Sequence, residues 1–229
     1  GACANFLKDV GFVAMHGKSE LVLRELQTSC FAETVTEFSF PSSNLFAPAG
    51  VIKNGSFDSM PNLEFIEISG NEINVIEPGA FSELSKIYLL QMRENNLSDM
   101  QSLHSAICHL KALKYLYLSG NNFTEITSKS GGALSFSDLR HLELNRNSIR
   151  SLGTGDFSGM PLLKDFDCEY CDLETIAKDT FLTNAHLNRL CLKLGNTKLN
   201  WTATETWGIQ DETLSERLRS VAKGADYAC

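Results

Sequence analysis

The sequence lacks the features that mark several large classes of protein. None of its 229 residues belongs to an apolar run of the ~18 residues that a membrane-spanning helix needs, and its start does not follow the basic-then-apolar pattern of a secretory signal. The chain is thus expected to be either a mature secreted form or a cytosolic protein. Lys and Arg number 20 against 28 Asp and Glu, for a net charge of -8. Because nucleic-acid binding needs a basic face, we do not expect a nucleic-acid partner.

Catalytic motifs are also missing. The chain contains no Gly-x-Ser-x-Gly elbow, no His-Glu-x-x-His zinc motif and no Gly-rich phosphate-binding loop, and its histidines are scattered. We therefore expect no enzymatic activity, no metal site and no cofactor.

A repeated pattern, Leu-x-x-Leu-x-Leu-x-x-Asn-x-Leu, is present instead. Four copies keep every position: Leu63, Ile66, Ile68, Asn71, Ile73; Ile87, Leu90, Met92, Asn95, Leu97; Leu113, Leu116, Leu118, Asn121, Phe123; and Leu139, Leu142, Leu144, Asn147, Ile149. A copy at Val35 has Ser43 in the Asn position, one at Leu163 has Cys171 there, and a degraded copy starts at Leu187. We number the seven copies in chain order, from repeat 1 at Val35 to repeat 7 at Leu187. Their first residues are 28, 24, 26, 26, 24 and 24 residues apart, a spacing typical of a stacked solenoid.

A second marker supports this register. Four phenylalanines each lie six residues before the first residue of the next repeat: Phe57, Phe81, Phe157 and Phe181. Stacked repeats would bring them into an aromatic column on the convex side.

The position of each residue type predicts its structural role. The apolar residues alternate with period two, so we expect a short strand with these side chains pointing inward and the intervening ones outward. Since every repeat runs the same way, the strands should pair in parallel. The chain must then turn away, and the Asn amide can satisfy backbone groups that have no ladder partner. We predict an α/β solenoid, a horseshoe with a concave parallel sheet and an irregular or 3-10 convex side.

The ends of such a solenoid need caps, because each would otherwise expose its apolar core. We assign residues 1–34 to an N-terminal cap, 35–195 to the repeats and 196–229 to a C-terminal cap. Cys3–Cys30 is the disulfide that we expect first, and Cys191–Cys229 the second.

The C-terminal cap carries a helix signal. Thr213 and Glu216 have the spacing of a capping box. One face of the predicted helix holds four apolar residues, Leu214, Leu218, Val221 and Ala222.

The repeat pattern, with Phe in the Gly-x-Phe phrase, resembles the 24-residue class of extracellular leucine-rich-repeat proteins. This class includes Toll-like receptor ectodomains, variable lymphocyte receptors and small leucine-rich proteoglycans. The resemblance covers roughly residues 35–195. It implies a non-enzymatic scaffold that binds a protein or glycan on its concave face, as in a receptor or innate-immune module.

The register identifies which side chains such a ligand would meet. The second and fourth positions after the first residue of each repeat should face solvent, among them His141, Asp167 and Cys191. Phe65, Leu89, Tyr115 and Tyr117 would form an aromatic and apolar patch over three neighbouring strands. The polar candidates beside it are Arg93, His141, Glu143, Asn145, Arg146, Asp165 and Asp167, with Glu143 placed to pair with His141.

Aromatic anchors with a polar rim are typical of binding centres. The alternative for the patch is that strands carry aromatic residues for sheet packing alone. Two other functions also fit this fold: a structural or adhesive matrix protein that self-associates, and an inhibitor of a secreted enzyme.

Four glycosylation sequons favour an oxidising secretory compartment, so we expect the protein to be secreted or on the extracellular face of the plasma membrane. They lie at Asn54, Asn96, Asn122 and Asn200.

The remaining cysteines suggest structural roles. Cys168 and Cys171 have the spacing of a redox or metal pair, but the register puts them in an inward position and in the Asn position. We expect both to be buried and structural, and Cys108 to lie in the core of a convex segment. Because the chain has seven cysteines, at least one must lie outside internal bridges.

Overall fold

The chain forms two compact units, Gly1–Leu113 and Lys114–Cys229. The strands of repeats 1 to 3 belong to the first unit, and those of repeats 4 to 7 to the second. The computed structural model describes residues 12–14, 35–46, 49–127, 134–192, 196 and 198–222.

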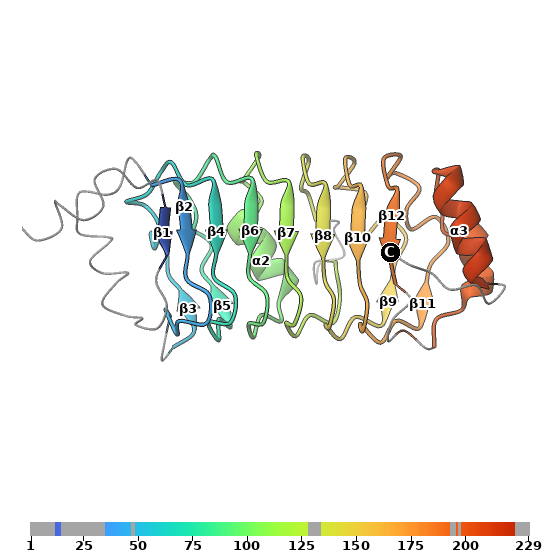
Figure 1. Cartoon of the computed structure of the whole chain (residues 1–229), viewed down its shortest axis with the longest axis horizontal. Helices are drawn as coiled ribbons and strands as arrows, with labels where there is room; N and C mark the ends of the chain where they lie inside the picture. The colour runs from blue at the N-terminus through green and yellow to red at the C-terminus, as the bar shows by residue number, and fades with distance from the viewer. Residues whose placement is uncertain are drawn as a thin grey trace, which may run out of the picture. The chain divides into compact units, whose positions relative to one another are not determined.

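The first unit contains a sheet of three-residue strands that lie side by side (Figure 1). Their order is β1 (Phe12–Ala14), β2 (Glu37–Ser39), β4 (Phe65–Glu67) and β6 (Leu89–Gln91). Each neighbouring pair is parallel. The strand β1, which precedes repeat 1, therefore covers the edge of β2 that would otherwise be unpaired.

The return segments of the first unit are more regular than we predicted. Two short strands, β3 (Val51–Ile52) and β5 (Val75–Ile76), pair in parallel, and repeat 3 contains a helix, α2 (Met100–Ile107). Asp99 caps this helix by accepting hydrogen bonds from the backbone N–H groups of Gln101 and Ser102, at 3.0 and 3.1 Å. The predicted irregular or 3-10 convex side did not include these short strands or this helix.

The second unit repeats this arrangement. Its sheet strands are β7 (Tyr115–Tyr117), β8 (His141–Glu143), β10 (Asp165–Asp167) and β12 (Arg189–Cys191), all paired in parallel in this order. Its return segments pair through β9 (Ser151–Leu152) and β11 (Thr175–Ile176). The predicted parallel solenoid is confirmed within each unit.

The strand register is the one that the repeat spacing predicts. Phe65 pairs with Leu89, and Asp165 pairs with Arg189, so equivalent positions of successive repeats lie opposite each other. The middle residue of each strand from β2 onward is buried, and the apolar positions of the pattern form the core. The predicted aromatic column is also confirmed within each unit: the ring centroids of Phe57 and Phe81 lie 5.2 Å apart, and those of Phe157 and Phe181 lie 4.9 Å apart.

The Asn position connects consecutive repeats. The Asn95 side chain accepts hydrogen bonds from the backbone N–H groups of Asn71 and Ile73, both at 3.0 Å, and donates to the carbonyl oxygen of Ile68 at 3.1 Å. Asn71 and Asn147 make equivalent bonds to the repeats before them. All four Asn side chains of the intact repeats are buried, as predicted.

Asn196 plays this role in repeat 7, where the pattern looked degraded. Its side chain accepts from the backbone N–H groups of Cys171 and Leu173, and donates to the carbonyl oxygens of Cys168 and Leu192. It lies nine residues after Leu187, whereas the Asn of the intact repeats lies eight after the first residue. We missed this residue because of that one-residue shift.

The residue immediately before the Asn position adopts a left-handed conformation in six repeats. These residues are Ser42, Gly70, Glu94, Gly120, Arg146 and Tyr170, with φ between 50 and 68°. The left-handed residue turns the chain out of the strand. The Asn side chain that follows can then donate hydrogen bonds to backbone carbonyl groups of the preceding repeat. Only two of the six are glycine, although side chains disfavour this conformation.

The C-terminal cap, at the end of the second unit, contains η2 (Trp201–Thr206) and α3 (Glu212–Ala222), which pack against each other. Backbone bonds from Asp179 to Thr206 and from Phe181 to Trp207 attach it to repeat 6. On α3, Leu214, Leu218 and Val221 are buried, as predicted, while the side chain of Ala222 lies outside the described part.

The predicted capping box of this helix was wrong. The helix begins at Glu212, before Thr213, and the carboxylate of Asp211 accepts the hydrogen bond from the backbone N–H of Leu214 at 2.6 Å. Asp211 therefore caps the helix, because an Asp oxygen satisfies a first-turn N–H group as well as the Thr hydroxyl of a capping box would.

Candidate ligand-binding surface

The side chains at the second and fourth positions of each repeat lie on the sheet face opposite the core. We call this surface the outer face of a unit. In the second unit it carries Tyr115, Tyr117, His141, Glu143, Asp165, Asp167, Arg189 and Cys191.

The two tyrosines of β7 lie on this outer face and are half-buried, whereas Leu116 between them is buried in the core. The ring centroid of Tyr117 lies 4.9 Å from that of His141, with the planes tilted by 42°. This contact fixes one side of the imidazole and leaves part of the phenol ring accessible.

His141 is only 9 % exposed and lies between acidic residues of the next strand. Its Nδ1 atom is 3.8 Å from Asp165 Oδ2, and its Nε2 atom is 3.9 Å from Asp167 Oδ2. Both distances are too long for a hydrogen bond. The carboxylate of Glu143 accepts a hydrogen bond from the hydroxyl of Ser119, and its expected pairing with His141 stays a prediction.

Asp167 is 5 % exposed and is paired with Arg189, whose Nη1 atom donates to Oδ2 at 3.0 Å. Burial raises the pKa of the Asp167 carboxyl above its ordinary value of 3.8, and the positive charges of Arg189 and His141 offset this only in part. Glu143 raises the pKa further by repulsion. This acid is therefore held in an unfavourable environment on the outer face.

Three positions that we expected to face solvent are buried: His141, Asp167 and Cys191. Tyr117 lies against His141, Arg189 contacts Asp167, and Cys191 is disulfide-bonded. Strand alternation correctly predicts the face on which a side chain lies. It does not predict how far long side chains of neighbouring strands bury that side chain. That expectation of exposure was wrong for these three residues.

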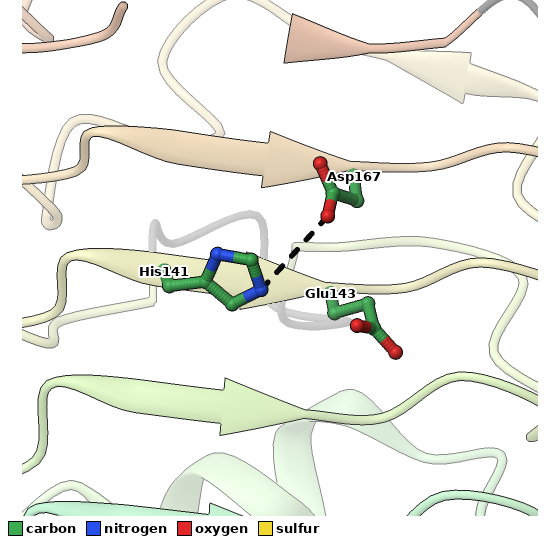
Figure 2. A group of neighbouring side chains, drawn as sticks. All are labelled: His141, Glu143 and Asp167. Atoms are coloured by element: carbon green, nitrogen blue, oxygen red, sulfur yellow. Dashed lines mark ion pairs between the residues drawn. The ribbon is translucent and has the colours of Figure 1, made fainter. Parts of the chain in front are cut away.

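The outer face brings together three residues that could bind a metal ion. His141 and Glu143 of β8 and Asp167 of β10 each offer one ligand atom, and these atoms lie within 4.8 Å of one another (Figure 2). This cluster could not be predicted as a metal site from the sequence, because its members come from two repeats and match no short motif.

The turns after the strands also hold candidate residues. The Asn145 side chain accepts a hydrogen bond from the backbone N–H of Glu169 at 2.8 Å, so it helps join repeats 5 and 6. The guanidinium of the exposed Arg146 lies 5.7 Å from the ring centroid of Tyr170. Tyr170 is 49 % exposed, and we did not select it, although it occupies the same position as Arg146 one repeat later.

In the first unit, Phe65 and Leu89 are cross-strand partners, and both are half-buried on the outer face. Nearby, Arg93 donates to the side-chain oxygen of Gln91 at 2.6 Å. Because the predicted patch combines residues of both units, its continuity from Leu89 to Tyr115 stays a prediction.

Two of the cysteines have a clear structural role, whereas Cys108 does not. Cys168 and Cys171 are buried, as predicted, and form a disulfide with each other, which we did not predict. Their Cα atoms lie 5.6 Å apart, within the usual range for a bridge. Cys108 is a free thiol, half-buried at the end of α2 rather than in the core.

Cys191 is also disulfide-bonded. Its expected partner Cys229, and the expected pair Cys3 and Cys30, lie outside the described residues. These pairings stay predictions.

All four sequon asparagines are exposed. Asn96 and Asn122 each follow the buried Asn of their repeat directly, on the turn that leaves the strand. No helix in the described part of the chain is both long and apolar enough to span a membrane.

Comparisons with known proteins agree with this architecture. The family described as "Leucine rich repeat" matches residues 49–97, and the "BspA type Leucine rich repeat region (6 copies)" matches residues 121–229. The chain is a leucine-rich-repeat protein. One family matches residues of the first unit and the other matches residues of the second. Both matched ranges contain repeats that we identified from the spacing of the sequence pattern.

Its relatives include receptors and small leucine-rich proteoglycans. This leucine-rich-repeat protein is 28 % identical to Toll-like receptor 3 of Boselaphus tragocamelus over 66 % of the chain and 17 % of the receptor. It is 29 % identical to keratocan of Danio rerio over 65 % of the chain and 42 % of keratocan. The chain thus spans less than half the length of these relatives.

A solved structure also shares the fold. The one described as "Crystal structure of TLR13-ssRNA13 complex" superposes with a TM-score of 0.60 at 20 % identity, covering 82 % of this chain and 27 % of that one. At this identity the likeness shows the fold alone.

Proposed function

We propose that this leucine-rich-repeat protein is an extracellular recognition module, of the receptor or innate-immune type, that binds a protein or glycan on the outer face of its strands. The observation that carries the proposal is the row of half-buried aromatic and charged side chains on that face. Tyr115 and Tyr117 offer aromatic area, and Arg189, Asp165 and Glu143 offer charge beside it. Such a mixture is typical of the energetic centre of an interface.

The relatives support the proposal at a coarser level. Toll-like receptor 3 is a receptor by name, and the name "Transforming growth factor beta activator LRRC33" in Danio rerio describes action on another protein. This kinship and the lack of catalytic motifs support a non-enzymatic role as part of the proposal.

An extracellular location is part of the proposal. Four exposed sequons and a buried disulfide favour an oxidising secretory route. A glycan and disulfide map of the protein secreted from animal cells tests it. We expect sugar on at least two of the four sequons and an oxidised Cys168–Cys171 pair, and unglycosylated, fully reduced protein would contradict the proposal.

The binding test starts from arrays of extracellular proteins and glycans screened with the purified chain. Each ligand found is titrated against the double variant Tyr115→Ala and Tyr117→Ala, with Leu182→Ala as control, because Leu182 is exposed on a return segment. We expect the double variant to lose at least about thirtyfold in affinity, as for an interface hot spot. Its melting temperature should stay near that of the wild type. Equal affinity in the double variant and the control would remove the outer face as the binding surface.

A further inference from the structure

We propose that His141, Glu143 and Asp167 form a binding site for a transition-metal ion of the Zn²⁺ type on the outer face of the second unit. The three residues offer one imidazole nitrogen and two carboxylate oxygens, all within 4.8 Å of one another. Nitrogen and oxygen donors of this kind suit Zn²⁺, whereas Ca²⁺ and Mg²⁺ prefer oxygen ligands alone. The inference goes beyond the proposed recognition function and does not depend on it.

Unpartnered buried atoms support the site independently of its composition. In the described part of the chain, His141 Nε2 and Asp167 Oδ1 are both buried and have no hydrogen-bond partner. Buried polar atoms are normally satisfied, so two such atoms on adjacent side chains need an explanation. Figure 2 shows the Nε2 atom of His141 directed at the Asp167 carboxylate.

The gap between these groups has the size of a bridging ion. His141 Nε2 and Asp167 Oδ2 are 3.9 Å apart, too far for a hydrogen bond. Two zinc bonds of about 2.0–2.1 Å that meet at the tetrahedral angle hold their ligand atoms about 3.4 Å apart, so a side-chain shift of about half an ångström would bring both atoms to an ion. An ion could therefore join β8 to β10 without separating the paired strands.

Surrounding groups orient the ligands. The ring of Tyr117 lies against the imidazole, and the hydroxyl of Ser119 donates to the Glu143 carboxylate, so both ligands on β8 are supported from repeat 4. Because Glu143 is half-buried, the ion would keep an open position toward solvent. Three protein ligands with one open position are typical of zinc sites that bind a further ligand.

Arg189 is the competitor for this site. Its guanidinium donates to Asp167 Oδ2 at 3.0 Å and places a positive charge beside any ion. Removing this charge should strengthen metal binding, whereas a purely structural role of the cluster makes no such prediction.

The test is calorimetric titration of the full chain with ZnCl₂ in metal-free buffer, with CaCl₂ and MgCl₂ in parallel. The variants are His141→Ala, Glu143→Gln and Arg189→Met, and the matched control is His186→Ala, because His186 is exposed outside the cluster. Thermal melting without metal shows that each variant is folded. Glu143→Gln provides a second ligand variant at a half-buried position, should His141→Ala fail to fold.

We expect the wild type to bind one Zn²⁺ ion and neither Ca²⁺ nor Mg²⁺. The folded ligand variants should lose about tenfold or more in affinity, and His186→Ala should match the wild type. Arg189→Met should bind Zn²⁺ more tightly than the wild type, because it lacks the competing positive charge. No saturable Zn²⁺ binding in the wild type, equal affinity in Glu143→Gln, or the same loss in His186→Ala would overturn the proposal.

Discussion

The side-chain amide of Asn147 donates to the carbonyl oxygen of Leu118, 3.1 Å away and 29 residues earlier in the chain. This bond crosses from one repeat to the one before it. The same side chain accepts from the backbone N–H of Phe123 at 3.0 Å and donates to the carbonyl oxygen of Leu144 at 2.8 Å. One amide thus satisfies backbone groups of two repeats where the strand ladder ends.

Replacing Asn147 with Ala should therefore be costly. The change leaves buried N–H and C=O groups without partners, and we expect the free energy of unfolding to fall by about 3 kcal/mol. Asn188→Ala is the matched control, since its side chain is exposed outside this ladder. Urea unfolding of both variants measures the difference, and a similar small effect in both would show that the ladder adds little stability.

The left-handed turn before the Asn position gives a pair of opposite predictions. Gly70→Ala should destabilise the protein by about 1 kcal/mol or more, because φ is +66° and the new Cβ would lie 2.6 Å from Ser42 Oγ. Glu94 has φ of 50° at the equivalent position and is exposed, so Glu94→Gly should be neutral or stabilising by up to about 1 kcal/mol. Thermal melting distinguishes them. A loss of stability in both variants would contradict the assigned turn.

A buried acid predicts a pH dependence. Burial raises the pKa of Asp156 above its ordinary value of 3.8, with repulsion from Glu125 adding to this effect and a hydrogen bond from the Gly153 backbone opposing it. The folded state then binds more protons than the unfolded state, so the stability contributed at this position decreases as pH rises from 3.8 through the raised pKa.

Asp156→Asn should remove this loss, because Asn can still accept the bond from Gly153 at 2.6 Å but carries no charge. Unfolding midpoints in urea at pH 3.8 and at pH 7 provide the measurement. The gain in stability of the variant over the wild type should be larger at pH 7 than at pH 3.8. Parallel pH profiles for the two proteins would exclude this account of Asp156.

The sequence predicted those parts of the fold that recur. Strand register, buried Asn side chains and the aromatic column follow from positions such as Asn95 and Phe157, which repeat at nearly constant spacing. Departures from the repeat were harder to predict. The helix α2 follows its N-cap Asp99 within a longer repeat, and Asn196 is shifted by one residue, so neither matched the pattern.

The sequence predicted which side chains lie on the outer face, but not which of them are buried there. Alternation placed His141 and Asp167 on the correct side of the sheet. Their burial depends on Tyr117 and Arg189, which come from neighbouring repeats, and a single sequence does not show how far such side chains cover one another. For the same reason, the sequence could not predict that His141 Nε2 and Asp167 Oδ1 are buried without hydrogen bonds.

Tyr115 faces outward and Leu116 faces the core, and the proposed binding surface depends on this alternation. Native-state thiol labelling of two variants, Tyr115→Cys and Leu116→Cys, tests this directly when the introduced cysteine is followed by peptide mass spectrometry. We predict that the thiol at position 116 reacts at least about a hundredfold more slowly than the thiol at position 115, because it is exposed only when the structure opens. Equal rates, or faster labelling at position 116, would contradict the register and the binding surface derived from it.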